Sequence, residues 1–331
     1  MQNAGPPPES YANLSLPALK LSHHPPTAPT ATPIILVSLH RPEVHNAFNN
    51  TMMLSLERAF ALLSADPRVK CIVLTGSDPT NRIFCAGMEL NPDILSTSAA
   101  AADVDAEASR LAASTATTHR DGGGRVSLAI FRCPKPVIAA LNGSAVGIGA
   151  TMTLPCAIRV THTAARVGFV FARRGLVLEG CSSFFLPRLL GTSRALHLAT
   201  TGGVYPVTDP LLDGLFTLVD DPAQVVPRAL AIAEDVARNA SVVSTVMMRD
   251  MMYRGAASPE GAHLLESRIL FDLFSRPDFV EGVKAFVEKK EPVLVGEMPR
   301  DAPGVWPWWE DELVKAKEKE DGNGNGGKAK L

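Results

Sequence analysis

The chain has 331 residues, of which 46% are hydrophobic and 20% charged, and its formal net charge is −2. This composition supports one large buried core with an accessory region, and it lacks the basic field that a nucleic-acid partner requires. The five cysteines lie apart in apolar contexts without paired metal-ligand spacing, so we expect no metal site. No apolar run reaches the roughly 20 residues of a membrane-spanning helix, so we expect no membrane span.

The beginning of the chain differs in composition from the residues after it. Residues 1–32 contain PPP, HHPP and TAPTATP, which predicts a disordered proline-rich segment outside the fold. In residues 33–206 apolar runs alternate with helical spacing, which predicts an α/β core. The predicted buried strands are Ile34–Leu39, Val69–Leu74 and Val137–Leu141, and the predicted helix is Thr51–Leu63.

Two later regions have their own patterns. Ser96–Gly124 is rich in Ala, Ser and Thr and ends in three glycines, which favours a mobile excursion that could cover a ligand. Residues 207–300 have helical spacing and are predicted to form a C-terminal helical region. Its candidate helices are Val225–Ala237, Val242–Tyr253, His263–Phe274 and Pro277–Val287.

Residues 301–331 combine a tryptophan cluster with a flexible tail. Trp306, Trp308 and Trp309 are predicted to anchor the C-terminus to the body or to another subunit. The chain ends in Ala329-Lys330-Leu331, a form of the Ser-Lys-Leu address, after a Gly/Asn-rich stretch that stays exposed. We therefore expect a peroxisomal import receptor as a partner and localisation in the peroxisomal matrix, the alternative being a Lys-rich tail that happens to end in leucine.

Two glycine motifs are candidates for backbone donor sites. In Phe84–Leu90 (FCAGMEL) a glycine allows a tight turn that exposes an N–H group, although a turn of this kind is often no more than a turn. In Pro134–Gly149 a buried strand leads through glycines into an apolar helix, so free N–H groups and the positive helix end point to one place. That place suits an enolate oxygen. It is not a phosphate loop, because Lys and Ser/Thr do not follow the glycines in the required order.

Together with Arg41–Phe48 (RPEVHNAF), these motifs occur in the order and spacing of the crotonase superfamily, which the chain resembles from about Pro33 to Pro292. The resemblance implies a ββα-spiral core with a C-terminal helical trimerisation region, and hence a homotrimer or hexamer. It also implies an acyl-CoA thioester substrate whose carbonyl accepts bonds from the backbone N–H groups of Met88 and Ile148. Coenzyme A then enters as part of the substrate, and no other cofactor is expected.

Two residues depart from the family pattern at this donor site. Glu89 stands where the first motif usually has aspartate, and Ile148 stands where the second donor is usually glycine. Ile148 raises the sharper question, because a β-branched residue resists unusual backbone angles.

The acid/base residues separate the reactions within the superfamily. Hydratases of this family carry two glutamates, and the matching positions here are Thr151 and Phe171. The next carboxylate is Glu179, in a segment (EGCSS) that resembles peroxisomal Δ3,Δ2-enoyl-CoA isomerases, whose matching glutamate is the catalytic base. The alternative is that Glu179 only lies at a helix N-terminus, where a carboxylate is stabilised.

The resemblance therefore predicts isomerisation of 3-enoyl-CoA to trans-2-enoyl-CoA in fatty acid β-oxidation. Glu179 would take the α-proton and return it to the γ-carbon, and we expect Phe171, Leu178 and Phe184 to line its site and raise its pKa. Two alternatives stay open. One is another crotonase-type acyl-CoA enzyme, a hydratase or one of a secondary-metabolite pathway, and the other is a catalytically silent scaffold that binds CoA.

Further residues are predicted to bind the coenzyme A part of the substrate. Arg41, His45 and Asn46 lie in the first loop, where the family places the nucleotide end, and Ala86 lies in the first glycine motif. Basic residues that follow the last predicted helix resemble those that approach CoA from the same or a neighbouring subunit; these are Lys289 and Lys290. The alternatives are solvated surface residues and a charged helix end, where lysines are favourable anyway.

Overall fold

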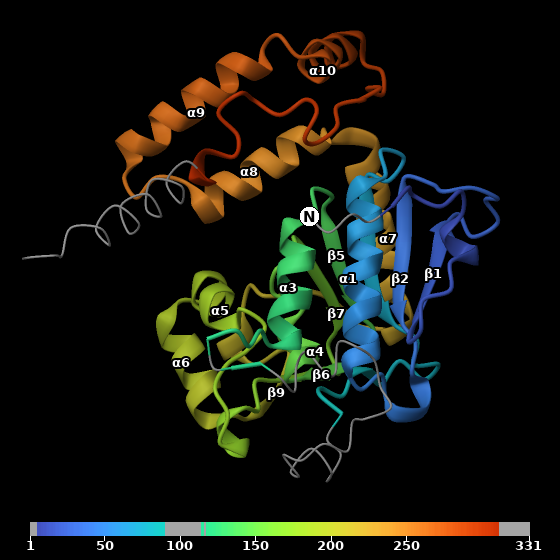
Figure 1. Cartoon of the computed structure of the whole chain (residues 1–331), viewed down its shortest axis with the longest axis vertical. Coiled ribbons are helices and arrows are strands. Elements are labelled where there is room, and N and C mark those ends of the chain that lie inside the picture. Colours follow the sequence, from blue (N-terminus) through green and yellow to red (C-terminus); the bar gives the residue numbers. More distant parts are fainter. Residues whose placement is uncertain (1–4, 90–113, 116, 311–331) are drawn as a thin grey trace, which may run out of the picture. The chain divides into compact units, whose positions relative to one another are not determined.

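The computed structural model describes residues 5–89, 114–115 and 117–310 (Figure 1). The chain divides into two compact units, Met1–Ala237 and Arg238–Leu331. The predicted excursion Ser96–Gly124 lies mostly outside the described residues, as does the C-terminal Ala-Lys-Leu. Within the described ranges, every helix is too short or too polar to cross a lipid bilayer.

The larger sheet of the first unit consists of six strands in the order β1-β2-β3-β5-β7-β10. β1 is antiparallel to β2, and the other neighbours are parallel. β3 and β5 are buried along their whole length, as is typical of continuous apolar runs in parallel sheets. The strands span Leu19–His24, Ile34–Leu39, Cys71–Gly76, Val137–Leu141, Ile158–His162 and Thr217–Val219.

A second sheet has four strands in the order β4-β6-β8-β9. After each of β3, β5 and β7 in the larger sheet, the chain places its next strand in the smaller one, which is the repeating pattern of the predicted spiral. Both glycine motifs therefore contain residues of the smaller sheet, the first in β4 and the second in β6. Its strands span Ile83–Cys85, Ser144–Val146, Arg166–Gly168 and Val204–Pro206.

Two helices of the first unit, α1 and α3, begin at side chains that accept a hydrogen bond from a free backbone N–H. Asn49 accepts a bond from Met52 N before α1, and Asp121 accepts one from Gly124 N before α3. The α-helices are α1 Asn50–Ala65, α3 Gly122–Arg132, α4 Ile148–Thr151, α5 Ser182–Leu190, α6 Thr192–Thr201 and α7 Val225–Asn239. Single 3-10 turns occur at Tyr11–Asn13, Pro42–Val44, Ala172–Arg174, Pro210–Leu212 and Pro222–Gln224.

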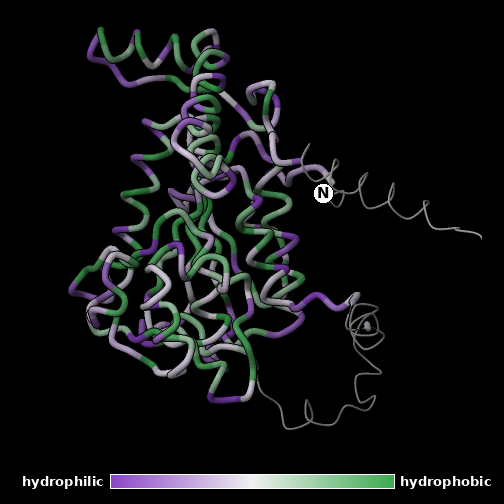
Figure 2. The backbone as a smooth tube through the Cα atoms, turned by 90° about the vertical axis from the view of Figure 1, so that its left-hand side faces the viewer, coloured by the Kyte–Doolittle hydropathy of each residue, from purple (hydrophilic) through white to green (hydrophobic). Residues whose placement is uncertain are grey.

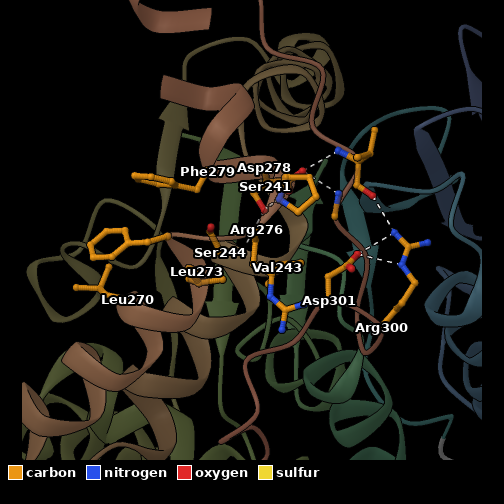
Figure 3. A pocket seen from close by; sticks show the side chains of 14 residues that line it. Ser241, Val243, Ser244, Leu270, Leu273, Arg276, Asp278, Phe279, Arg300 and Asp301 are labelled. Atoms are coloured by element: carbon orange, nitrogen blue, oxygen red, sulfur yellow. Dashed lines mark hydrogen bonds and ion pairs between the residues drawn. The ribbon is translucent and has the colours of Figure 1, made fainter. Parts of the chain in front are cut away.

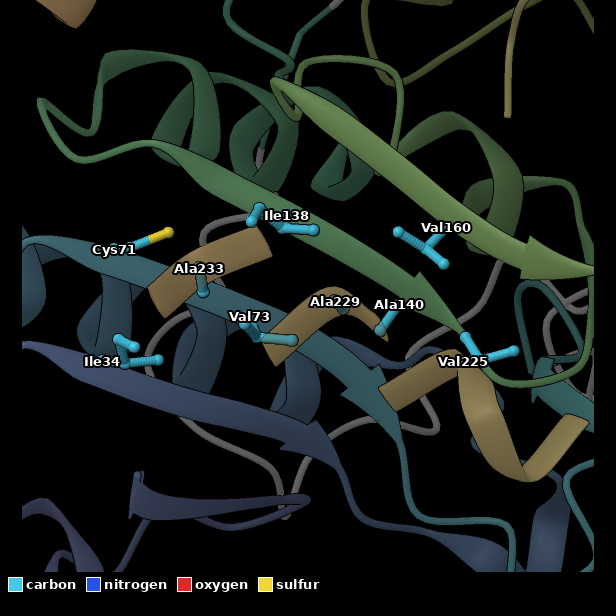
Figure 4. Close-up of a cluster of buried hydrophobic side chains, with 9 residues drawn as sticks. All are labelled: Ile34, Cys71, Val73, Ile138, Ala140, Val160, Val225, Ala229 and Ala233. Atoms are coloured by element: carbon cyan, nitrogen blue, oxygen red, sulfur yellow. The ribbon is translucent and has the colours of Figure 1, made fainter. Parts of the chain in front are cut away.

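The helix α7 packs against the larger sheet through small residues. Ala229 and Ala233 lie over Val73 and Ile138, and all four are fully buried (Figure 4). Burial of such apolar surface stabilises the layer by about 25 cal/mol per Å². β10, which pairs with β7, and most of α7 thus belong to the first unit. The first unit therefore extends beyond residue 206, where the sequence predicted the end of the core.

The N-terminal segment is part of the fold, so the prediction that residues 1–32 are disordered is wrong over Tyr11–His24. Leu19 and Leu21 alternate with more exposed residues in β1, which covers the edge of the larger sheet. Tyr11 is fully buried, and its hydroxyl donates to Asp66 Oδ2 at 3.0 Å. An extended proline-rich segment can still add a strand at a sheet edge, where half of its backbone groups need no partner.

The second unit is helical, as predicted, with α8 Val242–Arg254, α9 Pro259–Leu273 and α10 Pro277–Glu288. Hydrophobic and hydrophilic residues alternate along these helices (Figure 2). Trp306 Nε1 donates to Asp250 Oδ2 at 3.0 Å, and Trp308 Nε1 donates to Arg254 O at 2.8 Å. The two bonds therefore attach Trp306 and Trp308 to α8 within the second unit.

A hollow of about 220 Å³ in the second unit lies beside the start of α10 (Figure 3). Asp278 accepts bonds there from Ser241 Oγ at 2.5 Å and from the backbone of Val295 and Gly296 at 2.8 and 2.9 Å. These bonds tie the segment after α10 to the starts of α8 and α10. The carboxyl group of Asp278 is thus used to hold these segments together.

Candidate active site

The first glycine motif forms a turn that follows β4 and rests on the first loop. Phe48 N donates to Gly87 O at 2.8 Å, and Glu89 N donates to Phe48 O at 2.8 Å. Gly87 has φ of 91°, a conformation that favours glycine. The N–H of Met88 lies between these bonds and donates to no other residue in the described part of the chain.

The second motif turns sharply at Gly147, where φ is 55° and ψ is −128°, and then begins α4. This conformation is open essentially only to glycine, so the glycine carries the unusual angles. Ile148 itself is helical, which removes the concern about its β-branched side chain. As the first helical residue it has a free N–H, without an acceptor among the residues placed in the structure.

The two motifs meet through their glycines. A Cβ added at Gly147 would lie 3.9 Å from the α-carbon of Gly87, and one added at Gly87 would lie 3.0 Å from Val146 O. The donors of Met88 and Ile148 each follow one of these adjacent glycines. Two free N–H groups brought together in this way can stabilise an oxyanion.

Glu179 lies beside α4, the helix that begins at Ile148. Its Oε1 accepts a bond from Thr151 Oγ1 at 2.6 Å, so the last residue of α4 holds the carboxyl group. Its Oε2 is buried and has no hydrogen-bond partner in the part of the chain that the structure describes. A Cβ added at Gly123 would collide with Oε2 and would lie 2.7 Å from Ile148 Cδ1. The carboxyl group of Glu179 and the side chain of Ile148 therefore adjoin the same glycine of α3.

The surroundings of Glu179 disfavour its charged form. Burial raises the pKa of this carboxyl group to about 7, and the negative charge of Asp121 adds to the rise. The hydrogen bond from Thr151 opposes it by stabilising the carboxylate. A carboxyl group with a pKa near neutrality is suited to take a proton and return it.

The predicted lining of this site by Phe171, Leu178 and Phe184 stays a prediction. The Phe184 ring packs under the guanidinium of Arg188, whose central carbon lies 3.7 Å from the ring centroid. The groups that the structure places at the carboxyl oxygens are instead Gly123 and Thr151.

Sequence reasoning missed the role of α3. The three glycines at 122–124 indicated the end of an excursion, because glycine is a poor helix former. In the structure they form the first turn of α3, capped by Asp121. Any side chain at Gly123 would displace the Glu179 carboxyl group, so the glycine is needed for close approach. The N-cap aspartate before the glycines was the available signal.

Two of the three first-loop residues make hydrogen bonds within the first unit. Arg41 Nη1 donates to Glu89 Oε2 and to Ala47 O, both at 2.7 Å. Asn46 is fully buried, and its Nδ2 donates to Phe84 O at 3.1 Å. Arg41 holds the Met88 turn through its ion pair with Glu89. For Arg41 and Asn46 contact with CoA stays a prediction.

The other predicted CoA contacts are exposed. His45 and Ala86 lie at the surface, joined by a bond of 3.1 Å from Ala86 N to His45 O. Lys289 and Lys290 follow α10 in the second unit, where Lys289 has a left-handed conformation and Lys290 Nζ lies 3.1 Å from Glu288 Oε2. For these four residues contact with CoA stays a prediction.

Comparison with known proteins agrees with this fold. The sequence profile of the enoyl-CoA hydratase/isomerase family matches residues 30–297, so the chain belongs to that family. The enoyl-CoA hydratase ACTT3 of Alternaria alternata is 44% identical over 265 residues, 80% of this chain and 83% of that protein. The 1,2-epoxyphenylacetyl-CoA isomerase of Escherichia coli is 27% identical, over 80% of this chain and 95% of that one.

A solved structure confirms the fold class. A probable enoyl-CoA hydratase/isomerase from Mycobacterium abscessus superposes with a TM-score of 0.68 and 28% identity, covering 84% of this chain and all of that one. The mixed α/β crotonase fold with a helical C-terminal region is thus established, and an acyl-CoA substrate is consistent with the family. Membership does not separate hydration from isomerisation.

Proposed function

We propose that this chain moves a proton on an unsaturated acyl-CoA, with Glu179 as the acid/base residue and the N–H groups of Met88 and Ile148 as the oxyanion donors. One observation carries the proposal: the buried Glu179 carboxyl group and the free N–H of Ile148 belong to residues that pack against the same glycine. The raised pKa of Glu179 supports a role in which the group both accepts and donates a proton.

The first candidate reaction is the shift of a double bond from 3-enoyl-CoA to trans-2-enoyl-CoA, as in β-oxidation of unsaturated fatty acids. Glu179 removes the α-proton, and the electron pair moves into a dienolate whose charge lies mainly on the thioester oxygen. The two N–H groups stabilise that oxygen, each by about 3 kcal/mol in comparable sites. Glu179 then returns the proton to the γ-carbon, so a single carboxyl group balances the reaction.

Hydration of a 2-enoyl-CoA, or reaction of a specialised acyl-CoA from a secondary pathway, is the second candidate. The similarity to relatives named enoyl-CoA hydratases favours it over the first candidate. The site favours isomerisation, because Glu179 is paired with a threonine, Thr151, and not with a second carboxyl group. In hydration Glu179 alone would have to activate water and protonate carbon. A silent scaffold is disfavoured by the presence of all three site groups.

Product analysis separates these reactions. Purified protein is incubated with 3-hexenoyl-CoA, 3-decenoyl-CoA and trans-2-hexenoyl-CoA, and the ultraviolet absorption of the conjugated thioester is followed. Its appearance from the 3-enoyl substrates indicates isomerisation, and its loss from the 2-enoyl substrate, with a hydroxyacyl product by mass spectrometry, indicates hydration. Glu179→Gln is the control and should abolish either reaction. Equal activity in the variant would exclude Glu179 as the acid/base residue. An absence of turnover with intact CoA binding would support the silent scaffold.

We also propose that the protein is imported into peroxisomes through Ala329-Lys330-Leu331. A fluorescent protein fused before residue 1, so that the C-terminus stays free, should colocalise with a peroxisomal marker. Removal of the last three residues should leave the fusion in the cytosol. Equal import of both fusions would contradict this role.

We further propose a homotrimer or hexamer that uses the second unit. Several large apolar side chains of α9 and α10 are exposed, among them Phe271 at 77% and Phe286 at 85%. Monomeric proteins rarely expose contiguous apolar surface on this scale. A second copy of the chain is the partner that the family resemblance indicates.

A further inference from the structure

Glu179 has two carboxyl oxygens in different surroundings. Oε1 accepts the Thr151 hydroxyl at 2.6 Å, a short bond of the charge-assisted kind. Oε2 has no hydrogen-bond partner among the described residues and is buried against Gly123, which also borders the side chain of Ile148. The oxygen beside Gly123 is therefore the one with unused hydrogen-bonding capacity.

Thr151 is itself firmly placed. It ends α4, the helix that begins with the donor residue Ile148, and its side chain is fully buried. Its N–H donates to Gly147 O at 3.0 Å, which closes the short helix on the glycine that shapes the oxyanion turn. The hydroxyl of Thr151 and the N–H of Ile148 are thus parts of one rigid turn.

We propose that Thr151 is a positioning residue that holds Oε1 of Glu179, so that Oε2 is the oxygen that exchanges protons with the substrate. This inference rests on the proposed function for its catalytic meaning. It assigns Thr151 a task of its own: the threonine fixes the carboxylate at a set place relative to the oxyanion donor. Correct placement of a base within reach of the reacting carbon is a large part of its effect.

Other groups near Glu179 could affect the same readouts. Asp121, before α3, acts on Glu179 through its charge, and Cys181 lies two residues away with its pKa raised by burial. The control residue is Ser127, whose hydroxyl is buried beside Gly180, like that of Thr151, and has no hydrogen-bond partner among the described residues. Ser127 therefore provides a buried hydroxyl next to the same glycine that makes no hydrogen bond to Glu179.

The test compares Thr151→Val, Thr151→Ser and Ser127→Ala with the wild type in the full chain. The pH dependence of kcat/KM is measured on whichever acyl-CoA the wild type converts. Loss of a hydrogen bond to a carboxylate raises its pKa, so we expect the ascending limb for Thr151→Val to move up by about one pH unit. Above the limb we expect a further loss in kcat, because the base is no longer held. Thr151→Ser should restore both, and Ser127→Ala should change neither.

A second readout does not depend on turnover. Glutamate labelled with carbon-13 at the side-chain carboxyl is titrated by NMR, with Glu179→Gln used to assign the signal. The midpoint should rise in Thr151→Val and stay unchanged in Ser127→Ala. Loss of the proposed function would leave this shift intact, whereas the positioning role fails if the midpoint and the pH profile are the same in Thr151→Val and the wild type. A general loss of structure would show as equal losses in Thr151→Ser.

Discussion

The two units of the chain place their apolar residues differently. In the first unit continuous apolar strands of the larger sheet and α7 bury their side chains against one another, and the turns at Gly87 and Gly147 follow β4 and β6 of the smaller sheet. In the second unit α9 and α10 leave apolar side chains exposed, including Leu264, Phe271 and Phe286. A self-contained core can hold a site to within fractions of an ångström, while an exposed apolar face calls for a partner. Substitutions in the first unit should therefore change chemistry, and those on α10 should change association.

The largest effect is expected from Gly147→Ala. Alanine is strained by about 1–3 kcal/mol at φ of 55° and ψ of −128°, and relief of that strain would turn the Ile148 N–H away. Activity should fall about 100-fold, as when one oxyanion donor is lost. Gly175→Ala is the matched control, with φ of 67° and open space around it. It should lower the unfolding midpoint slightly and leave kcat/KM near the wild-type value; similar activity losses in both variants would argue against a specific role for Gly147.

Phe286→Asp, on α10, should weaken the association between copies of the chain. A charge at this exposed apolar position of α10 would be costly in a buried contact between copies. We expect a smaller assembly by analytical ultracentrifugation, with the circular dichroism of the folded chain unchanged. Lys284→Glu, on the same helix, changes a charge without removing apolar surface and should keep the wild-type mass. An unchanged mass for Phe286→Asp would exclude this face from the interface.

The free energy of unfolding should depend on the ionisation of the buried Glu179 carboxyl group. The pKa of Glu179 is about 7 in the folded protein against an ordinary value of 4.5, so the folded state binds the proton more tightly. Stability is therefore lost as pH rises from about 4.5 to about 7, by at most about 3 kcal/mol. Glu179→Gln should be more stable than the wild type at pH 8, and the difference should shrink at pH 5. Thermal unfolding at the two values checks this, and a gain that does not depend on pH would contradict it.

A smaller shift is expected from Asp121→Asn. Asparagine also caps helices well, so α3 should keep its first turn while the charge is lost. The pKa of Glu179 should then fall by a few tenths of a unit, opposite in sign to the effect of Thr151→Val. The difference should vanish in high salt, because an exposed charge is screened. A shift that persists in high salt would indicate a structural cause.

The sequence predicted the parts of the fold that local patterns determine. Ile34–Leu39 and Val137–Leu141 form strands with the predicted bounds, and α7 to α10 follow the predicted helical spacing. Glu179, Met88 and Ile148 were named through motif resemblance, and the structure brings their motifs together.

The rest depends on contacts that no local pattern carries. Tyr11 is buried only because Asp66 and the sheet edge meet it, and Gly123 is required only because Glu179 packs against it. Asn46 looks like a surface polar residue until its bond to Phe84 O is seen. In each case a residue far along the chain decides the role.

The central claim is that Glu179 works as an acid/base with a pKa set by its burial beside the oxyanion donors. The most direct measurement is the pH dependence of kcat/KM for the wild type, since this ratio reports the ionisation of the free enzyme. We predict an ascending limb with its midpoint at about pH 7, absent from the residual activity of Glu179→Gln. A midpoint at the ordinary carboxyl value of 4.5, or the same limb in both proteins, would contradict the claim.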